Sequence, residues 1–519
     1  MAKPNFTANR RKGQRSLKAR WPCSSPRAGI VPRLLGIGVL GFLAVLLVAN
    51  CSGGQQETAV TAPAAGSRPA SQEPTSRPTP TVAAEPSPVP TSTPVPYLRV
   101  PADYPTIQAA IDAAQEGDLV VVSRGTYVEN LDFRGKDITV RSSDPQSAEV
   151  VAATILDGGG RGSVVTFQGG ETAAAILSGF TITNGNGTIY RKSSAQEEGD
   201  ARQFCNKGIF GSPEEERSCG GGIVVHGSSP TIEGNLLTGN RVSHGGGGIF
   251  VRSVSSPIIR NNQITSNEAG GGGGIFVTDH SSPTIEGNTI GHNRAENGGG
   301  IAVDWGSSPT IQGNTIEGNQ SQVAGGILVF NHSSAAITDN TIAANKATGG
   351  GGGGIFVGAA SDLILKGNEF SGNEAAFGGG VFAELASSLK VTSNTFTENL
   401  AGSFGGAIDL SGGCSAEIVD NVFRGNRGMH SGGGLCVIGR AFTTVKGNLF
   451  AGNEGTYGAA IYAKEEAIAI VVGNEFQGNL AQAQGGAVWV SLDSKLVLRE
   501  PDDNHYQANQ PDDICRSPD

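Results

Sequence analysis

The chain has 519 residues with 37 basic and 47 acidic side chains, which gives a formal net charge of −10. Nine of the basic residues and no acidic residue fall in the first 50 positions, so residues 51–519 carry 28 basic against 47 acidic side chains, a net charge of −19. A body this acidic argues against nucleic acid as a partner, because phosphates require a basic footprint.

Residues 1–50 are predicted to be an export signal. A basic opening leads into sixteen apolar residues, from Leu34 to Ala49, which is short for a membrane span. The next residues, Asn50 and Cys51, resemble the end of a bacterial lipoprotein signal, which implies that Cys51 becomes the lipid-bearing first residue. Asn50 departs from that pattern, so an uncleaved signal anchor is the alternative. Both interpretations place the chain at a cell surface, with membrane contact only through the N-terminal anchor.

Residues 51–96 are predicted to form a disordered stalk. They consist mainly of Pro, Thr, Ser and Ala and hold almost no large apolar side chain. Such a segment buries too little surface to fold, and its prolines keep it extended. We therefore expect a tether that leads to a folded body over residues 97–515.

The folded body is expected to open with a short capping helix. Residues 105–115 place Ile107, Ala110 and Ile111 at helical spacing, which favours a helix that covers the first coil of the body. Less regular β-rich coils follow, so residues 97–186 are predicted to be a cap and its adjoining coils.

A polar insertion at residues 187–220 interrupts the body. Cys205 and Cys219 lie in this insertion and could form a disulfide in an oxidising compartment. No Cys-x-x-Cys or Cys/His spacing indicates a metal site, and calcium has no Gly-Gly-x-Gly-x-Asp spelling to support it. The sequence therefore predicts no metal ion and no cofactor.

Residues 221–490 repeat one unit, in which the spelling Asn-x-x-x-x-Asn returns every 26 to 28 residues. A register this regular indicates a stack of supersecondary units that bury their apolar faces only against one another. The first asparagines of the ten pairs are Asn235, Asn262, Asn288, Asn314, Asn340, Asn368, Asn394, Asn421, Asn448 and Asn474. Residues 491–515 are expected to close the stack as a terminal cap.

Each unit contains three short runs of β-type residues separated by Gly, Asn, Pro and Ser, with no room for a helix. Each run contributes one apolar column that recurs from unit to unit, represented by Ile275, Ile285 and Ile290. Such columns are typical of a three-stranded coil whose neighbours pair in parallel. The asparagines are then expected to be structural, with amides that bond to the backbone and to the next Asn at each bend.

These units resemble the right-handed parallel β-helix superfamily. The segments Thr-Ile-Gln-Ala-Ala-Ile at 106–111 and Gly-Thr-Tyr-Val-Glu-Asn at 125–130 look like the opening of pectin methylesterases. Later coils combine Gly-Gly-Ala-Ile at 405–408 with Phe-x-x-Asn at 423–426, which is similar to polymorphic outer-membrane adhesins. The resemblance implies an all-β, right-handed parallel β-helix of about 26-residue coils, with three strands per coil and a short N-terminal capping helix.

The resemblance does not extend to catalytic residues. Pectin methylesterases carry Asp-Phe-Ile-Phe-Gly, and polygalacturonases carry Asn-Thr-Asp, Asp-Asp, Gly-His-Gly and Arg-Ile-Lys; neither set is intact in this chain. An adhesin-like binding protein is therefore favoured over an enzyme.

One turn of the stack, just after the Ile275 column, holds the most varied side chains. Consecutive coils bring neighbours there within hydrogen-bonding or water-bridged reach, and an indole face among polar groups suits a sugar chain. The candidates for binding are His226, Arg252, Trp305, Asn331 and His332. The candidates for acid–base catalysis are Asp279, His280 and Asp304. Simple solvation of an exposed turn is the alternative to both roles.

A further apolar column lies between the inward residues of the Ile275 strands and is expected to face outward. Phe250 and Phe276 belong to it. Exposed apolar columns of this length usually mark a contact surface. The alternative is that loops or the 187–220 insertion cover the column.

The sequence thus favours a non-catalytic, surface-tethered β-helix that binds polysaccharide or another cell-surface partner. One alternative is a polysaccharide lyase, hydrolase or epimerase of the same superfamily. A purely structural spacer in a surface layer is the other.

Overall fold

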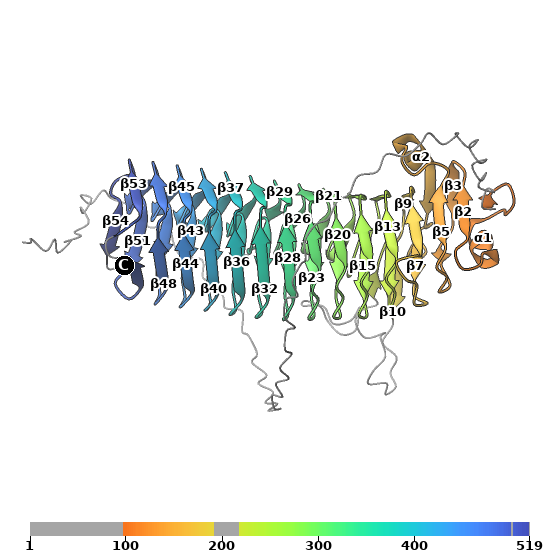
Figure 1. Cartoon of the computed structure of the whole chain (residues 1–519), viewed down its shortest axis with the longest axis horizontal. Helices are drawn as coiled ribbons and strands as arrows, with labels where there is room; N and C mark the ends of the chain where they lie inside the picture. Colours follow the sequence, from red (N-terminus) through yellow and green to blue (C-terminus); the bar gives the residue numbers. More distant parts are fainter. Residues whose placement is uncertain (1–96, 191–216, 500–501, 518–519) are drawn as a thin grey trace, which may run out of the picture. The chain divides into compact units, whose positions relative to one another are not determined.

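The computed structural model describes residues 97–190, 217–499 and 502–517. They wind into a parallel β-helix in which successive coils stack and each adds one strand to each of three sheets (Figure 1). Sheet A has fifteen strands from β1 (Leu98–Val100) to β52 (Lys495–Leu498), sheet B fourteen from β3 (Gly125–Val128) to β53 (His505–Gln507), and sheet C fourteen from β4 (Leu131–Asp132) to β54 (Ile514–Ser517). The predicted fold class is confirmed, and the three predicted strands recur from coil to coil.

One coil from the middle of the stack shows the path of the chain. It runs through β19 (Ile275–Val277) in sheet C, β20 (Thr284–Glu286) in sheet A and β21 (Thr289–Gly291) in sheet B. A fourth short strand, β22 (Arg294–Asn297), precedes the return to sheet C at β23 (Ile301–Val303). These fourth strands form a nine-stranded sheet D, from β18 (Glu268–Gly271) to β50 (Leu480–Gln484), which the sequence pattern does not predict.

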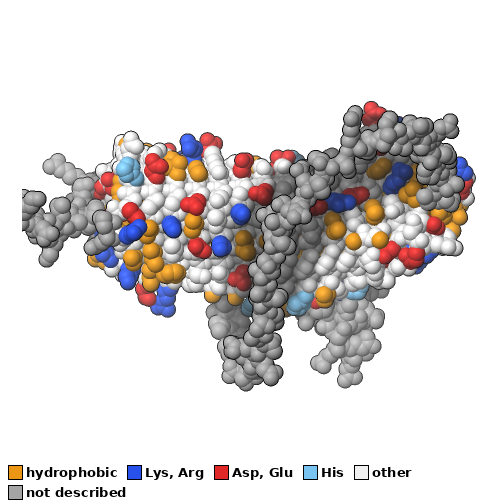
Figure 2. All heavy atoms as spheres, viewed as in Figure 1, with side chains coloured by type: hydrophobic (Ala, Val, Ile, Leu, Met, Phe, Trp, Pro, Cys, Tyr) orange, Lys and Arg blue, Asp and Glu red, His pale blue; other side chains and the backbone are white. Residues whose placement is uncertain are grey.

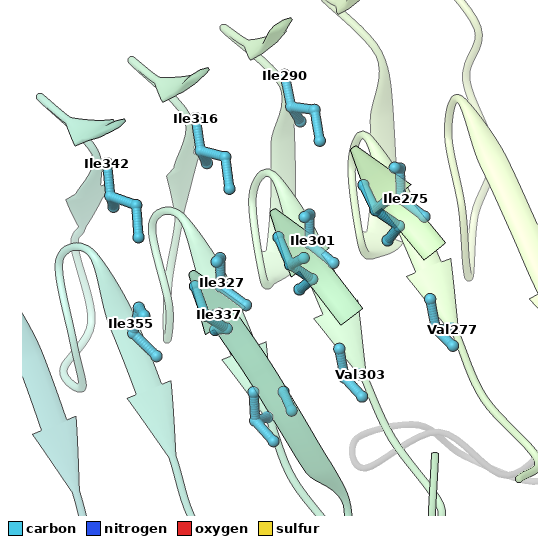
Figure 3. Close-up of a cluster of buried hydrophobic side chains, with 14 of the residues drawn as sticks. Ile275, Val277, Ile290, Ile301, Val303, Ile316, Ile327, Ile337, Ile342 and Ile355 are labelled. Carbon is cyan, nitrogen blue, oxygen red and sulfur yellow. The ribbon is translucent and has the colours of Figure 1, made fainter. Parts of the chain in front are cut away.

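The core consists of like side chains stacked on like. Ile290, Ile316 and Ile342 are fully buried and align in register along sheet B, and Figure 3 shows them repeating from coil to coil. In later coils the same column changes to phenylalanine, and the rings of Phe370 and Phe396 stack at 4.6 Å between centroids. Fully burying one such side chain contributes roughly 2 kcal/mol, so the columns dominate the stability of the stack.

The asparagines form two buried ladders at the corners on either side of sheet B. The Nδ2 of Asn314 donates to the Ile285 carbonyl at 2.9 Å and to Oδ1 of Asn340 at 3.0 Å. Its Oδ1 in turn accepts from the backbone N and Nδ2 of Asn288, at 2.9 and 3.0 Å. Each amide therefore satisfies its own corner and the corner of a neighbouring coil, which confirms the structural interpretation of the repeat.

Carboxylates end both ladders in the last coil. Asp502 Oδ1 accepts from the backbone N of Asn504 at 3.0 Å and also from its Nδ2. Asp513 Oδ1 accepts from Nδ2 of Asn509 at 3.0 Å. Each takes the place that the next asparagine would fill, so the final coil closes itself without a further repeat.

Two helices lie at the opposite end of the stack (Figure 1). Helix α1 (Ile107–Ala113) is the predicted one: Thr106 caps it by accepting from the backbone N of Ala109, and Ile107 and Ile111 are buried. It contacts β1, β2 (Leu119–Val122) and β4, and so covers the first coil. Helix α2 (Ala148–Ala153) is not predicted by the sequence pattern.

The 187–220 insertion leaves and returns through two antiparallel strands, β10 (Thr188–Tyr190) and β11 (Arg217–Cys219). Cys219 is disulfide-bonded, while Cys205 lies outside the described residues, so the predicted pairing stays a prediction. The predicted signal at 1–50, the lipidation site Cys51 and the stalk at 51–96 lie outside them as well. Among the helices that are described, none is long and apolar enough to cross a membrane.

Candidate functional site

From β15 (Ile249–Arg252) to β47 (Ile461–Ala463), the turn that follows each sheet C strand is built on two consecutive residues with left-handed backbone. Asp279 and His280 have φ of 56° and 56°, and Asn331 and His332 have φ of 51° and 57°. This conformation disfavours any residue with a Cβ, by roughly 1 kcal/mol or more. Side chains other than glycine at these positions therefore carry a backbone cost, which is a feature typical of functional turns.

Hydrogen bonds between successive turns align the residues into two columns, which we call the sheet C ridge. The backbone N of His280 donates to the Trp305 carbonyl at 3.0 Å, and the N of Gly306 donates to the Asn331 carbonyl at 3.0 Å. The first column of the ridge is Ser253, Asp279, Trp305 and Asn331, and the second is Val254, His280, Gly306 and His332. The ridge thus brings together the predicted binding residues Trp305, Asn331 and His332. The predicted catalytic residues Asp279 and His280 lie on it as well.

At one end of the ridge a serine links acid to imidazole. Ser253 Oγ lies 3.1 Å from His226 Nδ1 and donates to Asp279 Oδ2 at 3.2 Å. His280 Nδ1 lies 3.6 Å from Asp279 Oδ1, and the His280 side chain is 72% exposed. Ser253 therefore links His226 to Asp279 by hydrogen bonds, and His280 lies within ion-pair distance of the same carboxylate.

The middle of the ridge presents an aromatic face. Trp305 is 40% exposed although its φ of 49° is unfavourable for a bulky side chain. His332, further along, is exposed. Arg252 differs from the prediction: it is fully buried, with Nε donating to Ser253 Oγ at 3.3 Å, so its guanidinium is not exposed at the surface.

Asp304 also differs from the prediction, because it lies behind the ridge. It is only 1% exposed, and its Oδ1 accepts from Nδ2 of Asn331 at 2.7 Å and from the backbone N of Trp305 at 2.9 Å. Burial raises the pKa of Asp304 to about 6, and these hydrogen bonds partly offset that effect. The three catalytic candidates Asp279, His280 and Asp304 therefore do not share one accessible surface.

A small cavity lies on the far side of Asp304, between sheet C and sheet D. His244, Glu296 and Phe276 line it together with Asp304, and its volume is about 60 Å³. That space holds a few water molecules and is too small for a sugar ring. His244 and Glu296 were missed by the sequence analysis, and the only signal for them is their place in the glycine-rich stretch before each sheet C strand.

The outward apolar column of sheet C is covered. Phe250 is fully buried and Phe276 is 9% exposed, because sheet D and the glycines after it lie over them. A Cβ added to Gly245 would lie 2.2 Å from the Phe276 ring, so the cover approaches closely enough to require glycine. The prediction of an exposed contact surface at Phe250 and Phe276 is wrong, and the alternative of a covered column is confirmed.

The described residues contain no group of three or more His, Cys, Asp or Glu side chains that could hold a metal ion. On the face shown in Figure 2, acidic and basic side chains are interspersed over the described part of the surface rather than gathered by sign.

Comparison with known proteins supports the fold. A family model described as "Right handed beta helix region" matches residues 171–342 and 326–450, more than half of the chain. The receptor-binding protein of bacteriophage Det7, a podoviral tailspike in a myovirus, is similar at 13% identity over 80% of this chain and 76% of that chain, with a TM-score of 0.23. No curated protein matches the chain.

Proposed function

Because the chain belongs to the family of proteins with a right-handed β-helix region, we propose that it is a non-catalytic binding protein that holds a polysaccharide chain along the sheet C ridge. The observation that carries the proposal is the exposed Trp305 in register with Ser253, Asp279 and Asn331. An indole packs on the apolar face of a sugar, and flanking polar groups bind its hydroxyls.

The geometry of the stack suits a linear polymer. Coils repeat at roughly 4.8 Å, so consecutive ridge residues offer contacts at a constant step along the stack. The polar group of His226, Asp279 and His280 lies on one side of Trp305, and Asn331 and His332 lie on the other. A sugar chain laid across Trp305 would therefore meet hydrogen-bonding groups in both directions.

The proposal is tested by a matched pair of aromatic substitutions. Trp305 and Tyr457 are 40% and 39% exposed, but Tyr457 lies in sheet D and away from the ridge. On a polysaccharide retained by the native chain, Trp305→Ala is expected to weaken retention about 10-fold or more, since one stacked ring is worth at least 1.4 kcal/mol in such sites. Tyr457→Ala is expected to bind like the native chain. Equal retention by all three proteins would contradict the proposal.

A second candidate function is hydrolysis or another acid–base reaction on the same polymer. The observation that favours it is the pKa of Asp304, which burial raises to about 6, together with Glu296 on the same cavity wall. It requires the cavity to widen, because about 60 Å³ does not admit a sugar ring. Release of product by the native chain, lost in both Asp304→Asn and Glu296→Gln, would establish this function and contradict the non-catalytic proposal.

We further propose that the chain is exported and tethered at a cell surface. The motivation is the basic and apolar opening, the Cys51 context and the Pro-rich stretch up to residue 96. Metabolic labelling with a radioactive fatty acid is expected to mark the native protein and not Cys51→Ser. Unlabelled native protein that still sediments with membranes would indicate the uncleaved signal anchor instead.

A further inference from the structure

The covered column of sheet C contains one carboxylate. In its later coils the column passes from Phe382 in β35 (Val381–Ala383) to Asp409 in β39 (Ile408–Leu410) and Cys436 in β43 (Leu435–Val437), in register. Its other members from Phe250 to Trp489 are apolar side chains. Asp409 therefore stands where the fold elsewhere places an apolar residue.

Asp409 is fully buried, and among the described residues neither of its carboxylate oxygens has a hydrogen-bond partner. The Cys436 thiol, a weak donor, lies beside the carboxylate and offsets the effect of burial only in part. A buried carboxylate without partners is unfavourable when charged by several kcal/mol, so the acid form is the one that fits this site. Burial accordingly raises the pKa of Asp409 to about 7.

The side of Asp409 that faces away from the core is closed by sheet D and its glycines. β38 (Leu400–Phe404) leads into Gly405, where an added Cβ would lie 2.6 Å from the Asp409 Cβ. β42 (Arg427–Ser431) leads into Gly432, where an added Cβ would lie 3.0 Å from the Cys436 Cβ. The inward side is fixed by the packed core residues Ile408 and Leu410, so the sheet D side is the one that can yield.

The charged groups around Asp409 do not neutralise it. Glu384, in the turn after β35, adds a further negative charge, and burial raises the pKa of Glu384 as well. Burial raises the pKa of the Cys436 thiol, and the negative charges of Asp409 and Glu465 raise it further. On the cover, β38 carries no titratable side chain, while β42 carries Arg427, which lies 3.8 Å from Glu454, and His430, whose ring contacts Phe404.

We propose that β38 and β42 form a pH-sensitive cover over the outer column of sheet C, closed while Asp409 is protonated and loosened when Asp409 ionises. Loosening lets water reach the carboxylate and uncovers Cys436. This inference does not depend on the proposed polysaccharide binding, since it concerns a different part of the stack.

Proton linkage determines how opening of the cover depends on pH. The closed form holds its proton up to about pH 7, whereas an open, solvated Asp409 returns to its ordinary pKa of 3.8. Opening therefore releases a proton, and between pH 5.5 and 8.5 the ratio of open to closed cover is expected to rise about 30-fold.

Hydrogen–deuterium exchange on the full chain tests the cover. After correction for the intrinsic pH dependence of exchange, protection of the β38 and β42 amides is expected to fall about 30-fold from pH 5.5 to 8.5. Strands β37 (Thr395–Thr397) and β41 (Val422–Arg424) belong to the same coils but lie in sheet B, and they should not change. In Asp409→Asn the pH dependence of β38 and β42 should be lost.

Three results would overturn the proposal: constant protection of β38 and β42 in the native chain, an equal fall in Asp409→Asn, or an equal fall in β37 and β41, which would indicate loosening of the whole stack. If Asp409→Asn does not fold, Asp409→Leu serves in its place, because Leu328 occupies the same column three coils earlier and is buried there. Asp409→Leu is expected to show the same loss of pH dependence.

Discussion

The asparagine corners and the sheet C turn both let the chain change direction once per coil, yet they are made in opposite ways. At the corners the same residue returns in every repeat, buried and bonded to its copy in the next coil. In the first column of the turn, nine consecutive coils hold Ser253, Asp279, Trp305, Asn331, Ala359, Leu385, Gly412, Gly439 and Glu465. Uniformity marks the positions that hold the stack, and variety marks the positions that are free to serve another purpose.

Left-handed backbone occurs at the corners as well as in the turn: Asn261 and Ser266, each directly before a ladder asparagine, have φ of 53° and 57°. At the corner before Asn288 the left-handed position is Gly287, with φ of 63°. In the turn, Trp305 and Leu385 adopt left-handed backbone at φ of 49° and 58°, where glycine would be more stable. Stability alone does not explain these residues; at Trp305, the proposed contact with a sugar chain would.

The largest expected effect tests whether the covered column of sheet C stabilises the stack, as the asparagine corners do. Phe250→Ala should lower the free energy of unfolding by about 4 kcal/mol, because it empties a fully buried site against Phe276 at 5.6 Å between ring centroids. Trp305→Ala, an aromatic truncation at the 40% exposed ridge, should cost no more than about 1 kcal/mol. Urea unfolding compares the two variants. Equal losses of unfolding free energy would show that the covered column is no more important for stability than the exposed ridge.

The next effect tests the corners themselves. Asn314→Ala removes the donors to the Ile285 and Asn340 oxygens and the acceptor for Asn288, all in a buried position. The free energy of unfolding should fall by about 3 kcal/mol, since the stranded backbone groups stay buried. His332→Ala, in the exposed turn, is the matched control and should change it by less than about 0.5 kcal/mol. A loss at Asn314 no larger than at His332 would refute the structural role of the ladder.

These effects separate what the sequence predicts from what it does not. Columns such as Ile290, Ile316 and Ile342 repeat at one period, so pattern alone assigns them to the core. Sheet D escapes prediction because its strands, such as Glu268–Gly271 and Gln320–Ser321, contain few β-type residues and are held extended by the stack beneath them.

The candidate site could be predicted only in part, because local pattern reveals its exposed residues but not those that sheet D covers. Asp279, His280 and Trp305 stand out in the sequence as polar or aromatic residues in a turn. The burial of Asp304 and its closeness to Glu296 depend on how sheet D folds over sheet C, which no local pattern encodes.

A smaller effect concerns the proton on Asp304. Its folded pKa of about 6 exceeds the ordinary 3.8, so its contribution to stability is complete below pH 3.8 and is lost as the pH rises to about 6. Between pH 4.5 and 7.5, the native chain should therefore lose about 2 kcal/mol more of its free energy of unfolding than Asp304→Asn does. Parallel pH dependence in the two proteins, measured by urea unfolding, would show that Asp304 is not buried as described.

The smallest effect tests the backbone cost of the turn. His332 is exposed with φ of 57°. His332→Gly should raise the free energy of unfolding by about 0.5 kcal/mol, because relief of the left-handed strain outweighs the greater flexibility of the unfolded chain. His332→Ala keeps the Cβ and should bring no such gain. Thermal unfolding of the two variants measures the difference, and a destabilised glycine variant would mean that the histidine side chain itself stabilises the turn.

The most direct test of the central claim is to pass the purified full chain over immobilised plant, algal and bacterial polysaccharides and to record retention and released product together, with Trp305→Ala alongside. The account predicts that at least one polysaccharide retains the native chain, that no product appears, and that Trp305→Ala is retained less. Product release, or retention that does not depend on Trp305, would contradict it.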